Sequence, residues 1–296
     1  MHIPVLLNKV IEYLDPKPGE NFIDCTVGAG GHSLAILKKN KPGKLLAIDC
    51  DNESLKLFKS KIRNSGFNFH RLILVNDNFR NLKEIVKKHK FYPINGILLD
   101  LGLSSWHIEK SKRGFSFRKD EPLKMNFGNR ELTAVEIINN FSEKNLEEIF
   151  SKYGEESYSR RIARRIVEKR KNKPIETTFQ LRDIIRGTIP FSKTRRGNID
   201  RVLARIFQSL RIVVNDELEN LKQSLKQSLE ILEPGGRLII ISFHSLEDRI
   251  VKNFFRDEKR KNSLKILTKK PIIPDEEEIK NNPRSRSAKL RAALKI

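Results

Sequence analysis

A glycine turn followed by a carboxylate is the most ligand-like pattern in this chain. An apolar run at residues 22–25 leads into Gly28-Ala29-Gly30-Gly31-His32-Ser33, and Asp49 ends the next apolar run about twenty residues later. Glycines let the backbone approach a ligand closely, and a helix that begins there offers unpaired N–H groups. A carboxylate at Asp49 can accept hydrogen bonds from the hydroxyls of a ribose. The pattern predicts a pocket for a nucleoside cofactor.

The glycine spacing separates two kinds of nucleoside cofactor. A nicotinamide dinucleotide typically uses Gly-x-Gly-x-x-Gly or Ala, where the last small residue lets the helix pack closely beside the pyrophosphate. This chain has Ser33 at that point. S-adenosylmethionine has no pyrophosphate, so the spacing favours it over a dinucleotide. A turn that binds no ligand is a further option, and the position of Asp49 argues against it.

Asp77-Asn78-Phe79 follows the third apolar run. An amide or carboxylate there can read the edge of an adenine, and the ring of Phe79 can cover its face. The alternative is that Phe79 packs in the core of the following helix. We expect this segment to help bind the adenosine half of the cofactor.

Asp100 emerges from a wholly apolar run into a turn that contains Gly102, Ser104 and Ser105. Packing alone does not favour a carboxylate at the end of a buried strand. Methyl transfer to an exocyclic base amine needs an acceptor for the N–H groups, because the nitrogen lone pair is delocalised into the ring. Orientation of the two reactants and well-placed hydrogen-bond acceptors would then accelerate the transfer, and no covalent nucleophile is needed. Asp100 would hold either the target amine or the ammonium group of the cofactor, and the sequence leaves both roles open.

The fifth apolar run ends in Phe243-His244-Ser245. Ser245 followed by Asp248 resembles a helix capping box, which would explain Ser245 by helix capping alone. Phe243 and His244 are not explained in that way. At the same edge of the sheet they could stack on a flipped base or hydrogen-bond to it.

The elements that must position these residues follow from the hydrophobic periodicity. Apolar runs at residues 21–25, 45–49, 72–76, 94–100 and 237–242 predict strands, and helical periodicity in the intervals between the first four predicts a parallel, doubly wound α/β sheet. Residues 106–212 show amphipathic helices without a clear strand. We therefore expect a discontinuous domain at residues 1–105 and 213–296, with a helical subdomain at 106–212 inserted into it.

The charge balance indicates a polyanionic partner. Lys and Arg number 59 against 37 Asp and Glu, a formal net charge of +22, and such an excess attracts nucleic acid through counterion release. A helix predicted at residues 158–173 collects Arg160, Arg161, Arg164 and Arg165 on one side, which favours phosphate contact over a merely solvated face. The general abundance of lysine remains an alternative explanation of the net charge.

The cysteine content and the length of the apolar stretches indicate the cellular compartment. Cys25 and Cys50 are the two cysteines, too few for a disulfide framework or a metal set, and no apolar stretch approaches eighteen residues. We expect a cytoplasmic protein with neither a membrane span nor a metal. The oligomeric state does not follow from the sequence.

Taken together, these residues resemble the bacterial family of S-adenosylmethionine-dependent methyltransferases that modify the N4 amine of a cytidine in the decoding region of 16S ribosomal RNA. The resemblance covers nearly the whole chain. Its carriers are residues 2–7, 28–33, 99–105, 113–117, 153–156, 207–212, 242–249 and 282–287.

The resemblance implies a Rossmann-like class I methyltransferase sheet and a partner that is 16S ribosomal RNA or the small ribosomal subunit. It also implies cofactor contacts, to which we add Gly28, at Gly30, Gly31, His32, Asp49, Phe79, Asp100 and His107. Asp100 is the expected catalytic residue. We expect substrate contacts at Ser104, Ser105, Arg113, Phe115, Phe243, His244, Arg160 and Arg164.

The chain departs from the family pattern at three places. Trp106-His107 replaces Pro-Gln, Lys124 and Asn126 replace an acid and an arginine, and residues 202–204 replace Pro-Ala-Thr. His107 can still donate or accept a hydrogen bond, but its charge varies with pH. These departures keep open a second function, that of a non-catalytic RNA-binding ribosome-assembly factor that retains the cofactor fold.

Overall fold

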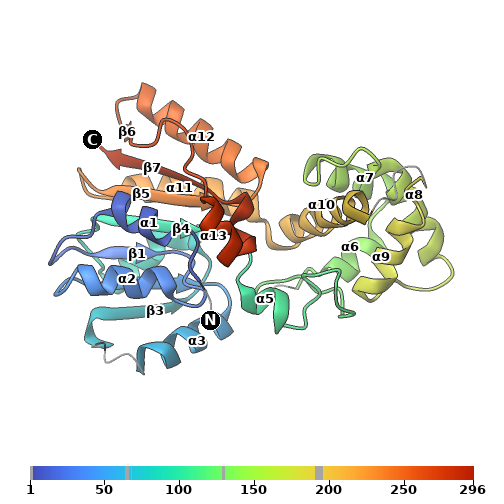
Figure 1. Ribbon diagram of the computed structural model, residues 1–296, viewed down its shortest axis with the longest axis horizontal. Coiled ribbons are helices and arrows are strands. Elements are labelled where there is room, and N and C mark those ends of the chain that lie inside the picture. The colour runs from blue at the N-terminus through green and yellow to red at the C-terminus, as the bar shows by residue number, and fades with distance from the viewer. Residues whose placement is uncertain (1–2, 64–66, 68, 129–130, 191–195) are drawn as a thin grey trace. The chain divides into compact units, whose positions relative to one another are not determined.

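The computed structural model describes residues 3–63, 67, 69–128, 131–190 and 196–296, and it divides the chain into two compact units (Figure 1). One unit comprises Met1–Gly102 with Leu218–Ile296, and the other comprises Leu103–Glu217. The sequence placed these boundaries after residues 105 and 212. His2, the first residue of the N-terminal family motif, lies outside the described residues.

The discontinuous unit contains a seven-stranded sheet in the order β3-β2-β1-β4-β5-β7-β6. The five predicted strands are present and parallel to one another. Apolar residues fill their interiors because both faces of a parallel sheet are covered. The strands are β1 (Phe22–Asp24), β2 (Leu45–Asp49), β3 (Leu72–Asn76), β4 (Gly96–Asp100), β5 (Arg237–Ser242), β6 (Leu264–Ile266) and β7 (Lys289–Lys295).

Helices cover both faces of this sheet (Figure 1). Ile23, Ile97 and Ile240 share one apolar core with α4, α11 and α12, while Phe22 and Leu98 share the other with α1, α2 and α3. Successive strand residues therefore face opposite layers. The helices are α1 (Leu7–Leu14), α2 (Gly31–Lys39), α3 (Asn52–Arg63), α4 (Leu82–His89), α11 (Glu217–Ile231) and α12 (Ser245–Arg260).

The C-terminal region contains two strands that the sequence did not predict. β7 pairs antiparallel with both β5 and β6, so the sheet is mixed at this edge and not wholly parallel as predicted. Asp248 of α12 accepts two hydrogen bonds from Arg291 of β7, at 2.7 and 3.1 Å. This pair fixes the helix against the added strand. Two short helices, α13 (Glu276–Asn281) and η4 (Pro283–Ser287), precede β7.

The inserted unit is helical, as predicted, and its described residues contain no strand. Leu146, Ile162, Leu181 and Leu203 belong to its separate apolar core. Within the described part of the whole chain, no helix is both long and apolar enough to cross a membrane. The helices of the inserted unit are α5 (Ser105–Glu109), α6 (Ala134–Asn140), α7 (Glu143–Lys152), α8 (Ser159–Arg170), α9 (Thr178–Arg186) and α10 (Arg196–Asn215).

Candidate active site

Polar residues gather at the carboxyl ends of the parallel strands, where an open α/β sheet binds its ligands. Asp24, Asp49, Asp100 and Ser242 are the last residues of β1, β2, β4 and β5. All four lie in the discontinuous unit. The main chain of β4 is tied to the loop after β1, because the Asp100 N–H donates to Thr26 Oγ1 at 2.7 Å.

Asp24 is buried at the centre of this edge. Its carboxylate accepts hydrogen bonds from Ser33 Oγ at 2.6 Å and from the Thr26 N–H at 3.1 Å. Burial raises the pKa of Asp24 to about 6, and the charge of Asp49 acts in the same direction, while the two hydrogen bonds act against the shift. The sequence alone did not predict a role for this residue.

Asp49 is bonded to the glycine loop. One carboxylate oxygen accepts from the Gly28 N–H at 2.8 Å, and the other accepts from the Asp51 N–H at 2.9 Å. A carboxylate has about four lone-pair sites, so it can accept ribose hydroxyls as well. The loop therefore fixes the orientation of the Asp49 carboxylate.

Gly30 and Gly31 lie where neighbouring side chains pack too closely for a Cβ. Gly30 has a left-handed φ of 74°, and a Cβ there would come within 1.8 Å of the Phe58 ring. A Cβ on Gly31 would come within 2.2 Å of Pro4 Cγ. These glycines let α3 and the N-terminal segment close on the start of α2, and they thereby bring the N–H groups of the helix to the sheet edge.

The end of β3 is a network of side-chain caps. Asp77 Oδ1 accepts from the Asn78 N–H and from Asn81 Nδ2, and Asn78 Oδ1 caps η2 (Phe79–Asn81) by accepting from the Arg80 N–H. Phe79 is partly buried and packs against the apolar core. The ring thus has a packing role whether or not it also covers an adenine.

Asp100 carries a buried acceptor that lacks a donor. Its side chain is 20% exposed, yet Oδ1 is buried and has no hydrogen-bond partner among the described residues. Burial, and then the charges of Asp24 and Glu247, raise the pKa of Asp100 well above its ordinary value. An unsatisfied buried oxygen is costly unless a ligand supplies the donor. Oδ2 lies 3.5 Å from His32 Nδ1.

The end of β5 differs from the predicted capping box. The cap of α12 is His244, not Ser245, and its acidic partner is Glu247, not Asp248, which pairs with Arg291. Glu247 Oε2 accepts from the N–H groups of Phe243 and His244, at 2.8 and 3.3 Å. The prediction failed because the residue-type pattern does not show that Asp248 is bound to a strand about forty residues later in the chain.

The capping contact determines the tautomer of His244. Its Nδ1 accepts from the Glu247 N–H, so Nε2 carries the proton of the neutral ring. Nε2 is buried 3.2 Å from Glu247 Oε1, without hydrogen-bond geometry to any described residue. The ring of Phe243 packs close to Gly102, whose φ of 101° turns the chain after β4.

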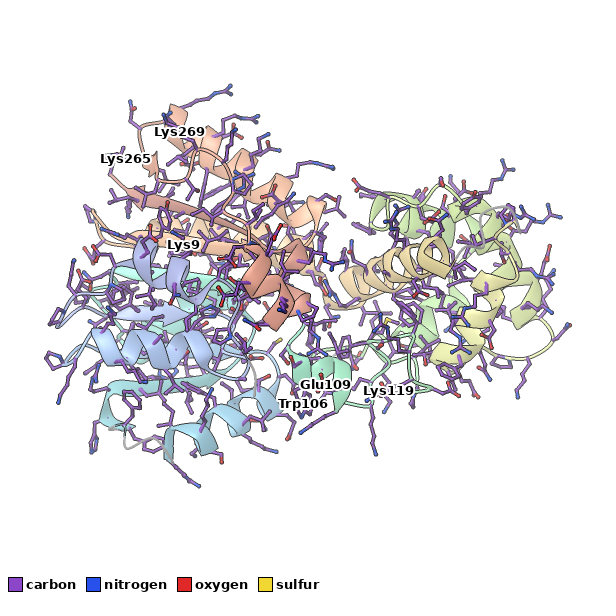
Figure 2. All side chains as sticks on the ribbon, viewed as in Figure 1. Lys9, Trp106, Glu109, Lys119, Lys265 and Lys269 are labelled. Atoms are coloured by element: carbon purple, nitrogen blue, oxygen red, sulfur yellow. The ribbon has the colours of Figure 1, made fainter. Side chains whose placement is uncertain are left out.

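In the inserted unit, Ser104 and His107 form the cap of α5. Ser104 Oγ lies 2.8 Å from His107 Nδ1, and the His107 ring is buried with edge contacts to Trp106, Phe115 and Phe127. Trp106 and Glu109 mark this helix in Figure 2. The histidine that replaces the glutamine of the family thus participates in both a cap and an aromatic cluster.

The other predicted substrate residues of this unit differ in exposure. Phe115 is buried and stacks on Phe127, so it contributes to the core, whereas the Arg113 guanidinium lies 5.4 Å from the centre of the Trp106 ring. Ser105 is the partly exposed first residue of α5. Of the three departures from the family pattern, Lys124 is exposed, and Val202 and Leu203 are buried in the apolar core.

α8 has the predicted division into an apolar and a basic side. Ile162, Ala163 and Ile166 are buried, while Arg160, Arg161, Arg164 and Arg165 are exposed. Arg164 and Arg165 both bind Glu168, at 3.1 Å. One glutamate offsets only one of these two positive charges, so α8 keeps a strongly basic exposed face.

The sequence alone did not predict a role for Glu247 or for Asp24. Glu247 is followed by a second acid in Glu247-Asp248, and nothing in the sequence shows which of the two faces the sheet edge. For Asp24, the available signal was a carboxylate between Ile23 and Cys25 in an otherwise apolar strand.

Comparison with known proteins agrees with this geometry. The sequence matches the model of the MraW methylase family over residues 1–296. It is 45% identical to the ribosomal RNA small subunit methyltransferase H of Dehalococcoides mccartyi strain BAV1, over 100% of this chain and 86% of the relative. It is 44% identical to the protein of that name from Halothermothrix orenii, over 100% of this chain and 98% of the relative. A crystal structure of a candidate rRNA methylase from Clostridium thermocellum superposes with a TM-score of 0.50 at 12% identity, over 100% of both chains, which is a likeness of fold.

Proposed function

This chain belongs to the MraW methylase family, and we propose that it transfers a methyl group from S-adenosylmethionine to the N4 amine of a cytidine in 16S ribosomal RNA. The observation that carries the proposal is the buried Asp100 oxygen without a donor, at the same sheet edge as the glycine loop and Asp49. Relatives that carry the name of a small subunit rRNA methyltransferase align over the whole of this chain.

The residues at the sheet edge fit this cofactor. Asp49 would accept from the ribose hydroxyls, and the start of α2 at Gly31 offers N–H groups to a polar ligand. Asp100 Oδ1 needs a donor, and both the ammonium group of the cofactor and the target amine are donors. When bound, S-adenosylmethionine supplies a methyl group that is already activated by its sulfonium.

The protein would contribute to the reaction by orienting the target base and by hydrogen-bonding to its amine. Asp100 would accept an N–H of the target amine, which frees the nitrogen lone pair from the ring and stabilises the positive charge that develops on nitrogen. Phe243 and His244 would hold the base, by stacking and by a hydrogen bond from Nε2. The arginines of α8 would bind phosphates of the RNA. A ribosomal RNA substrate favours a cytoplasmic location for this reaction.

Methyl transfer to RNA tests the proposal. The chain is incubated with methyl-labelled S-adenosylmethionine and, separately, with protein-free 16S RNA and with small ribosomal particles. The nucleosides of the products are then identified. We expect labelled N4-methylcytidine with at least one of the two substrates, and a large loss of label with Asp100→Asn. RNA binding without label on cytidine would instead favour the assembly factor, and tight binding of a nicotinamide dinucleotide would overturn the cofactor assignment.

A further inference from the structure

The buried ring of His32 lies between two hydrogen-bond acceptors. Its Nε2 is 2.9 Å from the Val5 carbonyl oxygen, and its Nδ1 is 3.5 Å from Asp100 Oδ2. The His32 residue is 5% exposed. Because the ring is buried between these two acceptors, they determine which of its nitrogens carry a proton.

The Val5 carbonyl fixes the tautomer of His32. A carbonyl oxygen accepts and cannot donate, so Nε2 must carry a hydrogen. If the ring is neutral, the bare lone pair of Nδ1 then faces the Asp100 carboxylate. Two buried acceptors that face each other without a proton are unfavourable. One additional proton between Nδ1 and Oδ2 removes the conflict.

We propose that His32 and Asp100 hold one proton at neutral pH and that His32 Nδ1 carries it. His32 would then be an imidazolium, and Asp100 would remain a carboxylate in spite of its burial. In this role His32 is a positioning residue that preserves the acceptor for the amine. The functional consequence rests on the proposed methyl transfer, whereas the proton itself does not depend on it.

Basicity and the surrounding charges decide which partner holds the proton. In water, imidazole is the stronger base, with an ordinary pKa of about 6.5 against about 3.9 for an Asp carboxyl. Burial raises the pKa of Asp100 and so opposes this order, whereas an ion pair with His32 restores it. Among the described residues, the other charged groups that face Asp100 are Asp24 at the end of β1 and Glu247 on α12, and both are acidic. Their charges disfavour a further anion and favour a cation beside it. Among the described residues, His32 is the basic side chain within ion-pairing distance of Asp100.

The Val5 carbonyl is itself held in place by the C-terminal region. We call residues 3–6 the N-terminal strap. The Leu6 N–H donates to Glu278 Oε1 at 2.7 Å, and Asn282 Nδ2 donates to the Ile3 carbonyl at 3.2 Å. Leu6 has a left-handed φ of 52°, which a leucine seldom adopts without such support. The strap therefore transmits the position of α13 to the ring of His32.

Nitrogen NMR of histidine-labelled, cofactor-free protein tests the position of the proton directly. We expect both ring nitrogens of His32 to be protonated at pH 7 and Nδ1 to lose its proton above the ordinary range of histidine. In Asp100→Asn the loss should move to lower pH. A neutral His32 with a bare Nδ1 at pH 7 in the unmodified chain would overturn the proposal, whatever the enzymatic activity.

The pH dependence of His32→Gln tests the functional consequence. Without its counterion, Asp100 should take up a proton at higher pH, so the acidic limb of kcat/KM should move upward by about one unit or more, which is about tenfold in activity on that limb. Activity should recover toward alkaline pH. His70→Gln, at an exposed histidine of η1 (Phe69–Arg71), is the matched control and should keep the original profile. An equal loss at every pH would indicate a structural role and would contradict the positioning role.

Discussion

At the scale of single residues, the proposed methyl transfer depends most on the carboxylate of Asp100. Asp100→Asn keeps the shape of the side chain but replaces one acceptor oxygen with a donor. By comparison with the removal of one group that stabilises a transition state, we expect kcat to fall by about 10²- to 10³-fold. Methyl transfer under single-turnover conditions measures this change. The partly exposed Asp257→Asn is the control, and equal activity of the two variants would contradict the assignment.

Asp24 is expected to affect stability rather than binding. Its folded pKa of about 6 lies above that of the unfolded chain, so the folded state binds the extra proton between about pH 4 and 6. The contribution of Asp24 to the free energy of unfolding therefore falls as pH rises through this window, by up to about 3 kcal/mol. The difference in unfolding free energy between the parent chain and Asp24→Asn, measured with denaturant from pH 4 to 7, should show this fall. A difference that does not change with pH would contradict the shift.

At the scale of elements, the conformation of the glycine loop depends on its contact with α3. Gly30→Ala adds a Cβ at a left-handed φ and against the Phe58 ring, and Gly235→Ala adds one at a similar φ of 80° with no atom within 4 Å. We expect Gly235→Ala to cost about 1 kcal/mol of unfolding free energy and Gly30→Ala to cost about 2–4 kcal/mol.

Calorimetric titration with S-adenosylmethionine gives a second readout for this pair of variants. Gly30→Ala should weaken binding strongly, because the start of α2 must move, whereas Gly235→Ala should bind as the parent chain does. Equal effects of the two substitutions on both stability and binding would show that the contact with Phe58 is unimportant.

The N-terminal strap provides an element-scale test of the link between α13 and the site. Glu278→Ala removes the acceptor of the Leu6 N–H, so we expect a several-fold rise in the Kd for S-adenosylmethionine. Glu278→Gln retains an acceptor oxygen and should restore most of the affinity. Glu277→Ala, at an exposed position of the same helix, is the control. If Glu278→Ala and Glu277→Ala bind equally well, the strap does not position the site.

The elements that the sequence predicted were those with a local signal. The five parallel strands are continuous apolar runs, and their ends correctly indicated the edge where Asp49 and Asp100 lie. β7 was missed because Lys289–Lys295 is rich in Lys, Leu and Ala, residues that do not favour a strand. It is a strand because β5 and β6 pair with it on both sides and Arg291 donates a hydrogen bond to Asp248.

The candidate site was predictable where chemistry and spacing coincide, as in the glycine loop and the acids that end β2 and β4. The tautomer of His32 was not predictable, because it depends on the Val5 carbonyl, and the position of Val5 depends on Glu278 at the other end of the chain. The capping role of His244 was not predictable either, because it depends on the contact of Asp248 with Arg291 of β7. Contacts between distant segments leave no periodic signal in the sequence.

At the scale of the whole molecule, the excess of 22 positive charges should make RNA binding depend on salt. Replacing both Arg160 and Arg161 with alanine removes two exposed cations at the start of α8. We expect weaker binding of 16S RNA and a slope of log affinity against log salt that is smaller by about 1–2. A fluorescence titration at several salt concentrations measures both quantities.

The double variant Lys87→Ala with Lys88→Ala is the control for net charge, because it removes two exposed lysines of α4 in the other unit. It should change the slope less. Equal slopes for the two double variants would mean that the net charge, and not the α8 face, determines affinity.

A crystal structure of this chain with S-adenosylhomocysteine is the decisive experiment for cofactor binding. If the ends of β1, β2 and β4 hold S-adenosylmethionine with its reactive end toward Asp100, the ribose hydroxyls will lie on Asp49 and the amino-acid end of the ligand will lie beside Asp100. A ligand bound elsewhere on the molecule, or bound here with Asp49 and Asp100 out of reach, would show that the cofactor site is wrongly assigned.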